Sequence, residues 1–264
     1  MSRSRTMLPG AADVRRPGPV VLLGGAEHRA PSAPVDRWLL DRVGRAGVRV
    51  TVIPAASTTA SLPATAALAR NHWTSLGARV TVVVPADGLT PRDDDALTDP
   101  DIVVLTGGVP GRLVRALGAS PLWERVLDQW RAGATLAGSS AGAIALFAWR
   151  LALRAPHPFR LVPGLGPLDG YVCVPHFDRF VRPLQALHPW VRRTERGFGG
   201  TGIVGIDEST ALVADAGQHR VLGRGAVTIV DDLGWRTHRS GDTADLAHPL
   251  TRPPVPRPAQ PVAA

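Results

Sequence analysis

The decisive stretch of the chain reads Thr135-Leu136-Ala137-Gly138-Ser139-Ser140-Ala141-Gly142-Ala143-Ile144-Ala145-Leu146. Its core fits the pattern G-x-S-x-G, in which a short apolar strand turns sharply into a helix. The pattern places the candidate nucleophile at Ser140 rather than Ser139. Small flanking residues are needed because the serine takes a strained backbone conformation, and a neighbouring Cβ would collide with the backbone. We therefore expect the Ser140 hydroxyl at the carboxyl end of the strand, over free N–H groups and the positive end of the helix dipole.

The same string also suits a tight strand-to-helix turn without any chemistry, because glycine, serine and alanine are abundant in this chain. The rest of the sequence has to decide between the two interpretations.

Length and charge set broad limits. A chain of 264 residues can bury a full-sized core, so one α/β domain is the natural expectation. The formal charge of +8 comes from arginine without any lysine, and no basic run interleaves with aromatic residues. This pattern argues against nucleic acid as a partner.

Cysteine usage and hydropathy point to a compartment. Cys173 is the single cysteine, which excludes an intrachain disulfide and fits a reducing, cytoplasmic location. The Cys and His clusters of structural zinc sites are absent, and we expect neither a metal nor another cofactor. No stretch approaches the roughly 20 apolar residues of a membrane span, so no membrane is expected as a partner.

Apolar strands alternate with amphipathic helices between a predicted disordered leader at residues 1–18 and a Pro-rich disordered tail at 242–264. Strands are expected at 20–23, 48–53, 80–84, 102–105 and 134–137, and helices at 34–44, 62–76 and in the segment before Gly133. Further strands at 171–174, 202–213 (with a turn) and 221–230 would complete the same sheet. The alternation predicts one α/β domain, residues 19–241, with a doubly wound, mostly parallel sheet.

Ligands of such sheets bind beyond the carboxyl ends of the strands. Glycine-rich turns at 24–25, 106–108 and 138–142 all fall at that edge and could share one cleft. A phosphate-binding role is the competing interpretation, but the chain has neither G-x-G-x-x-G nor a Walker lysine. An acidic run at 93–95 is interpreted as a solvated helix start rather than a metal site.

Hydrolysis by serine needs a base within hydrogen-bond reach of the hydroxyl. His176 is the best candidate because it follows the apolar strand 171–174, and a parallel sheet would bring that end to the edge where Ser140 lies. A capped structural histidine is the alternative.

The order of these motifs resembles the serine peptidases of the S51 type, which include cyanophycinase and dipeptidase E. The matching segments are 22–25, 52–57, 105–108, 138–143, 176–177, 205–212 and 223–227, and they run in order over nearly all of the folded chain. The resemblance implies a class I glutamine-amidotransferase-like, flavodoxin-like three-layer fold.

The same resemblance implies roles for individual residues. Ser140 would be the nucleophile and His176 the base, and the backbone N–H groups of Gly108 and Ala141 would form the oxyanion hole. Beyond what the resemblance implies, we expect Gly107 and Arg182 to contact the substrate. Arg150, Arg154 and Arg179 are also expected around the cleft, where arginines would favour a carboxylate-bearing ligand.

The chain departs from the family pattern at the triad acid and at two polar turns. The pattern expects Asp or Glu between nucleophile and histidine, but residues 141–168 contain neither. The family's Gly-Gly-Asp-Gln turn ends here in Val109-Pro110, and its Asp-Gln before the histidine reads Val174-Pro175. The carboxylates that could orient His176 from another direction are Asp169, Asp178, Asp207 and Glu208. Carboxylates at Asp207 and Glu208 could equally cap nearby N–H groups of a turn; of the four, Glu208 is taken as the third catalytic residue.

The sequence thus predicts a cyanophycinase-like serine peptidase that hydrolyses small aspartyl peptide or isopeptide bonds through an acyl-enzyme at Ser140. Its partner would be a small peptide substrate, and a homodimer is left open. The alternative is an inactive or impaired homologue that uses the same cleft as a binding module. A glutamine amidotransferase would require cysteine at position 140.

Overall fold

The computed structural model describes residues 16–84, 97–118, 120–152, 160–180, 201–248 and 250. Its helices are the 3-10 helix η1 (Ala30–Ser32), α1 (Ala33–Val43), α2 (Leu62–Ser75), α4 (Pro110–Leu117), α5 (Pro121–Arg131), α6 (Ala141–Ala145) and α7 (Phe177–Phe180). The strands of the largest sheet are β1 (Val20–Leu23), β2 (Arg49–Ile53), β3 (Arg79–Val82), β4 (Ile102–Leu105), β5 (Thr135–Ser139), β10 (Thr210–Asp215) and β11 (Gln218–Gly223). The remaining strands are β6 (Trp149–Ala152), β7 (Arg160–Pro163), β8 (Tyr171–Pro175), β9 (Gly202–Ile206), β12 (Ala226–Asp231) and β13 (Gly234–Arg239).

The largest sheet has the order β11-β10-β1-β5-β4-β2-β3. Strands β1 to β5 pair in parallel, and β10 and β11 add an antiparallel edge beside β1. The predicted α/β fold with a doubly wound, mostly parallel sheet is therefore confirmed.

Helices cover both faces of this sheet, as the wholly apolar sequence of β1 requires. Val21 and Leu23 face one way, into a core cluster with Trp73 of α2 and with residues of α1. Val20 and Leu22 face the other way, into a cluster with Trp123 of α5 and with residues of α4 and α6. Alternate residues of β1 thus pack against helices on opposite faces of the sheet, which gives three layers: helices, sheet, helices.

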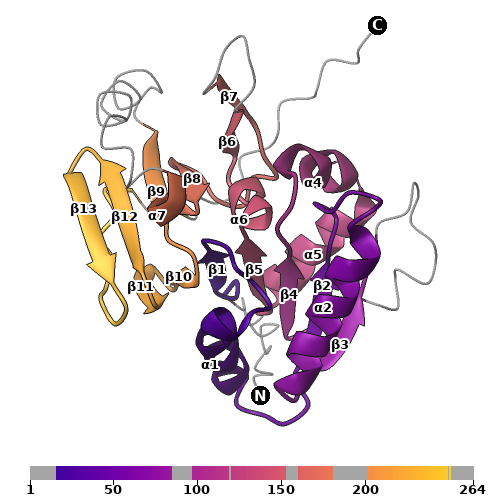
Figure 1. Cartoon of the computed structure of the whole chain (residues 1–264). Coiled ribbons are helices and arrows are strands. Elements are labelled where there is room, and N and C mark those ends of the chain that lie inside the picture. The colour runs from indigo at the N-terminus through magenta and orange to yellow at the C-terminus, as the bar shows by residue number, and fades with distance from the viewer. Residues whose placement is uncertain are drawn as a thin grey trace, which may run out of the picture.

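A second sheet, with the order β13-β12-β9-β8, lies beside the central sheet and is drawn in orange and yellow in Figure 1. The prediction that 171–174 and 221–230 complete the central sheet is therefore wrong. Strand β8 pairs with β9 in the second sheet, and the segment 221–230 divides at residues 223–225 into the end of β11 and the start of β12, which belong to different sheets. A short, fully buried apolar run carries no local signal of which sheet it joins.

Residues on both sides of the predicted domain, 19–241, make contacts with it. The Trp130 indole N–H donates a 2.7 Å hydrogen bond to the Gly18 carbonyl, and the Gly18 N–H donates in return to the Trp130 carbonyl. At the other end Leu250 is 1% exposed and its carbonyl accepts the Asp169 N–H. Residues 1–15 and 251–264, which make up most of the predicted leader and tail, lie outside the described residues, as does the acidic run 93–95.

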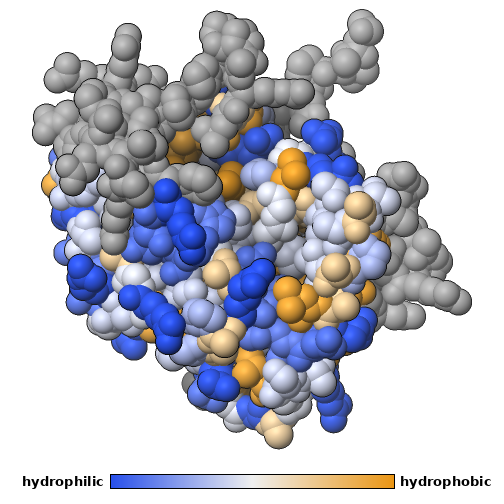
Figure 2. Space-filling view, in the orientation of Figure 1, coloured by the Kyte–Doolittle hydropathy of each residue, from blue (hydrophilic) through white to orange (hydrophobic). Residues whose placement is uncertain are grey.

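The surface seen in Figure 2 is largely hydrophilic, with small separate groups of hydrophobic residues. No helix among those that the structure describes has the length and apolar character needed to cross a membrane.

Candidate active site

The nucleophile turn connects β5 to α6, and Ser140 has φ 48° and ψ −108° there. The small flanking residues are required by close approach. A Cβ on Gly138 would lie 2.6 Å from the carbonyl carbon of Gly142, and a Cβ on Gly142 would overlap the carbonyl oxygen of Leu105. The strained, glycine-flanked turn predicted from the sequence is confirmed.

The helix after the serine is shorter than the apolar sequence indicates. It ends at Ala145 after five residues, little more than one turn. Its dipole is correspondingly small, so individual N–H groups at its start, rather than the helix as a whole, are available to stabilise an anion.

Ser140, His176 and Glu208 form one hydrogen-bonded line. The hydroxyl oxygen of Ser140 lies 2.9 Å from Nε2 of His176, and Nδ1 of His176 lies 3.0 Å from Oε1 of Glu208. The second carboxylate oxygen of Glu208 lies 2.9 Å from the guanidinium of Arg179. Because both ring nitrogens have partners, the imidazole is fixed in one orientation toward the serine.

These side chains meet where the two sheets join. Ser140 follows a strand of the central sheet, His176 follows β8 of the second sheet, and Glu208 lies in the link between β9 and β10, where the chain crosses from one sheet to the other. The reasoning that placed His176 and Ser140 at one edge of a single sheet is therefore wrong, although the two side chains are in contact.

Three consecutive carbonyls, from the last residue of β1 onward, hold the three segments in register. The Leu23 carbonyl accepts the N–H of Ser140 at 3.0 Å, the Gly24 carbonyl accepts the N–H of His176 at 2.9 Å, and the Gly25 carbonyl accepts the N–H of Ser209 at 3.1 Å. The His176 ring lies directly over Gly25, where a Cβ would overlap it. The turn at Gly24-Gly25 is thus the frame on which the line of three side chains is assembled.

The other three candidate carboxylates each accept a hydrogen bond from a backbone N–H group. Asp169 accepts from Gly170 at 2.8 Å, Asp178 from Glu208 at 3.0 Å, and the buried Asp207 from Ala226 at 2.8 Å. Both interpretations of the Asp207-Glu208 pair therefore apply, one to each residue: Asp207 caps the turn, and Glu208 reaches the histidine.

The loop after β4 lies against the nucleophile. A Cβ on Gly107 would be 3.2 Å from Cβ of Ser140, and Gly108 has φ +138°, a conformation that favours glycine. The N–H of Val109 donates to the Ala56 carbonyl at 2.8 Å, which fixes the loop from behind. Gly108 and Ala141, the two predicted oxyanion donors, thus belong to the two segments that flank the serine.

Glu27 is a site residue that the sequence reasoning missed. Its Oε1 accepts the N–H of Gly107 at 2.7 Å and its Oε2 accepts the hydroxyl of Ser139 at 2.8 Å. The Gly107 N–H therefore has a partner within the protein, and the predicted contact of Gly107 with substrate stays a prediction. The available signal was an acidic residue two positions after the glycine turn that ends β1.

Arginines gather near the start of α4, just beyond the loop. The guanidinium groups of Arg115 and Arg150 both lie around Gly111, 3.5 and 3.8 Å from the position that a Cβ would take there. Burial lowers the pKa of Arg150, and the like charge of Arg115 lowers it further. Arg154 and Arg182, which the sequence also assigned to the cleft, lie outside the described residues.

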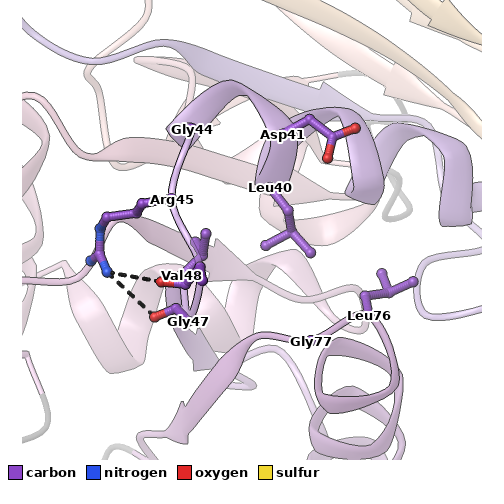
Figure 3. A pocket seen from close by; sticks show the side chains of 9 residues that line it. Leu40, Asp41, Gly44, Arg45, Gly47, Val48, Leu76 and Gly77 are labelled. Carbon is purple, nitrogen blue, oxygen red and sulfur yellow. Dashed lines mark hydrogen bonds between the residues drawn. The ribbon is translucent and has the colours of Figure 1, made fainter.

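Other features stand apart from this site. Cys173 is buried, and burial raises the pKa of its thiol. Within the described ranges no group of His, Cys, Asp and Glu side chains has the arrangement of a metal site. A surface cavity of about 480 Å³ lies at the opposite, amino end of the strands, between the ends of α1 and α2, where Leu40 and Leu76 point into it (Figure 3).

Comparison with known proteins agrees with the geometry. Residues 20–222 match Peptidase family S51. The chain is 31% identical over 253 residues to the cyanophycinase of Synechococcus elongatus, covering 89% of this chain and 74% of that protein. It is 28% identical over 249 residues to the cyanophycinase of Trichormus variabilis, covering 88% and 79%.

Two solved structures share the fold. A peptidase from an acI-B1 Actinobacterium superposes with a TM-score of 0.71 at 23% identity, covering 88% of this chain and 98% of that one. A putative peptidase E from Listeria monocytogenes superposes with a TM-score of 0.59 at 17% identity, covering 79% and 100%. The family match over most of the chain and the relative above 30% identity lead to one conclusion: the chain belongs to peptidase family S51 and is a serine-type peptidase.

Proposed function

We propose that this peptidase cleaves small aspartyl peptide or isopeptide bonds through an acyl-enzyme at Ser140. The observation that carries the proposal is the unbroken line of hydrogen bonds from Ser140 through His176 to Glu208. Serine, histidine and a carboxylate in this sequence of contacts are the groups that activate a hydroxyl for acyl transfer.

In the first half of the reaction Oγ of Ser140 attacks the carbonyl carbon while Nε2 of His176 takes its proton. Glu208 accepts the Nδ1–H, which keeps Nε2 free as the acceptor and stabilises the imidazolium. The oxyanion of the tetrahedral intermediate would be bound by the N–H groups of Gly108 and Ala141. The protonated His176 then donates to the leaving amine, and a water activated by the same nitrogen hydrolyses the ester.

The charge around the loop favours an acidic substrate. Arg115 and Arg150 are held close together around Gly111, and two like charges at short range repel each other. A substrate carboxylate between them would relieve that repulsion and could be gripped by two parallel N–H donors of one guanidinium. This supports aspartyl or isoaspartyl dipeptides, in which the free carboxyl carbon of the aspartyl residue lies only three bonds from the scissile carbonyl carbon.

Cyanophycin itself is a less suitable substrate for this chain than for its relatives. Polar residues that the family pattern places in the two turns are replaced here by Val109-Pro110 and Val174-Pro175. Cyanophycin presents arginine side chains, which the arginines near the start of α4 would repel. We therefore expect dipeptides to be hydrolysed and the polymer to be cleaved slowly or not at all.

The test is a panel of α-aspartyl and β-aspartyl dipeptides beside cyanophycin granules, with wild type and Ser140→Ala assayed in parallel. Ser140-dependent turnover of the dipeptides is the expected result. Fast Ser140-dependent release of aspartyl-arginine dipeptides from the granules would overturn the substrate assignment. Equal background rates for both proteins on every substrate, with ligand binding retained, would instead favour the binding-module alternative.

A further inference from the structure

We propose that Glu27 is a positioning residue, which sets the distance between the nucleophile and the oxyanion-binding loop. The inference rests on the proposed acyl-enzyme function and adds a residue to it. Its basis is a single carboxylate that accepts hydrogen bonds from both segments, from the Gly107 N–H at 2.7 Å and from the Ser139 hydroxyl at 2.8 Å.

Each of these donors is the immediate neighbour of a residue that acts on the substrate. Ser139 precedes the nucleophile Ser140, and Gly107 precedes Gly108, the proposed oxyanion donor. A movement of either segment relative to the other would have to break or stretch one of the two hydrogen bonds. Glu27 therefore couples the two groups that must act on the same carbonyl.

A carboxylate suits this role because it has two acceptor oxygens in a fixed geometry and no proton to donate. One oxygen serves each segment, and charge-assisted hydrogen bonds of this kind are shorter and stronger than neutral ones. Among the described arginines and histidines none forms an ion pair with Glu27. The two neutral donors are thus the partners that the structure gives this carboxylate.

The local sequence explains why Glu27 reaches this position. The segment that contains it begins with the three carbonyls of Leu23, Gly24 and Gly25, which accept the N–H groups of Ser140, of His176 and of Ser209, the residue after the acid. Gly107 has no side chain where one would obstruct the carboxylate, since a Cβ there would lie 2.5 Å from Oε1 of Glu27. The whole of residues 23–27 therefore acts as one organising segment, and Glu27 extends it to the oxyanion loop.

Loss of the carboxylate would also leave its partners unsatisfied. Ser139 is only 2% exposed, so its hydroxyl would have little access to water. A buried polar group without a hydrogen-bond partner destabilises the conformation that leaves it unpaired. The nucleophile turn and the loop after β4 would therefore shift until these groups find other partners. Misplacement by about 1 Å in an active site can lower the rate on the order of 10²-fold.

The experiment measures the rate at which diisopropyl fluorophosphate labels Ser140, because this neutral probe needs both nucleophile and oxyanion site but no substrate recognition. Glu27→Ala is expected to slow labelling on the order of 10²-fold. Glu27→Gln should stay within about threefold of wild type, because its amide oxygen can accept from Gly107 and its amide nitrogen can donate to Ser139. The matched control is Glu124→Ala, an exposed glutamate on α5.

Ser139→Ala removes one arm of the link and provides a second route if Glu27→Ala does not fold. It should slow labelling by less than Glu27→Ala, and the double variant should be no slower than Glu27→Ala, because the two side chains act through one contact. With an aspartyl dipeptide the loss in these variants should appear in kcat rather than in KM.

Three results would contradict the inference. Wild-type labelling rates in both Glu27→Ala and Ser139→Ala would show that the link does not position anything. A Glu27→Gln variant as slow as Glu27→Ala, with KM raised for the dipeptide, would mean that the charge recognises a cationic group of the substrate. Failure of the wild type to label at Ser140 would refute the proposed function before any Glu27 variant is made, and this inference with it.

Discussion

Replacing Glu208 by glutamine should nearly abolish the reaction, although the change is small in shape. Its carboxylate lies 3.0 Å from Nδ1 of His176 and 2.9 Å from the Arg179 guanidinium. A carboxylate serves both neighbours at once because both of its oxygens are acceptors. An amide has one acceptor end and one donor end, so its oxygen can accept from either His176 or Arg179 but not from both in this geometry.

Arg179 decides how that amide is oriented. A guanidinium can only donate, so the glutamine oxygen would turn toward Arg179 and the NH₂ group toward Nδ1 of His176. The imidazole would then accept at Nδ1 and carry its proton on Nε2, and Nε2 could no longer take the proton of Ser140. The substitution thus imposes the wrong tautomer in addition to removing the charge.

Two arguments give a similar magnitude for the loss. Opposite charges roughly 4 Å apart at an effective dielectric constant of about 20 attract each other by about 4 kcal/mol, or on the order of 10³ in rate. Removal of the orienting acid in a serine triad costs on the order of 10⁴ in turnover. We therefore expect Glu208→Gln to lower the acylation rate by 10³ to 10⁴, as orders of magnitude.

Stopped-flow acylation by p-nitrophenyl acetate measures this step without a known substrate. Asp178→Asn is the matched control. Asp178 accepts the backbone N–H of Glu208 but is not one of the three residues in the hydrogen-bonded line. Its effect should be much smaller. If the acylation rate of Glu208→Gln stays within about threefold of the wild-type rate, the orienting role of Glu208 is refuted.

Two further predictions concern the segment after β1. In Gly25→Ala the new Cβ would overlap the His176 ring, 2.6 Å from Nδ1, so acylation should fall on the order of 10²-fold. The control is Gly44→Ala, where φ is also positive but no atom lies within 4 Å of the added Cβ, and it should leave acylation unchanged. Equal acylation rates in the two variants would show that the position of the ring does not depend on Gly25. Burial lowers the pKa of His28 to about 4 from 6.5, so the unfolded chain binds the extra proton between these values, and stability present above about pH 6.5 is lost as the pH falls toward 4. That loss is about 3 kcal/mol. Urea unfolding of wild type and His28→Asn at pH 7.5 and 4.5 checks it, because asparagine tolerates the positive φ of this position; an equal pH dependence in the two proteins would contradict the assignment.

Much of the central sheet could be predicted because its strands are short apolar runs that end in glycine or proline. The ranges 20–23 and 102–105 agree with β1 and β4 residue for residue. The helices α1, α2 and α5 were indicated by apolar stripes and by glycine after their last turn. The nucleophile turn was the strongest local signal, since its backbone strain restricts which residues can stand beside Ser140.

The second sheet could not be predicted in the same way. β8, β9 and β12 are as apolar as the central strands, and their partners are far away in sequence. In edge strand β13 Trp235, Thr237 and Arg239 are exposed and no residue is fully buried, so it lacks the pattern of a buried strand. Sheet membership depends on long-range pairing, which a local pattern does not contain.

The choice of Glu208 as the carboxylate that contacts His176 also depends on long-range structure. The sequence offered four carboxylates near the expected site, and only the crossing of the chain between the two sheets brings Glu208, rather than Asp207, to the histidine. Glu27 was missed because its partners are a backbone N–H and a serine more than seventy residues away. Contacts between residues so far apart in the sequence cannot be predicted from the spacing of residues along the chain.

The most direct test of the account is the identity of the residue that diisopropyl fluorophosphate modifies. Intact-mass analysis followed by peptide mapping should find a single adduct on Ser140 in the wild type, none in Ser140→Ala, and much slower formation in His176→Ala. An adduct on Ser139, or one that persists in Ser140→Ala, would contradict the assignment of Ser140 as the nucleophile.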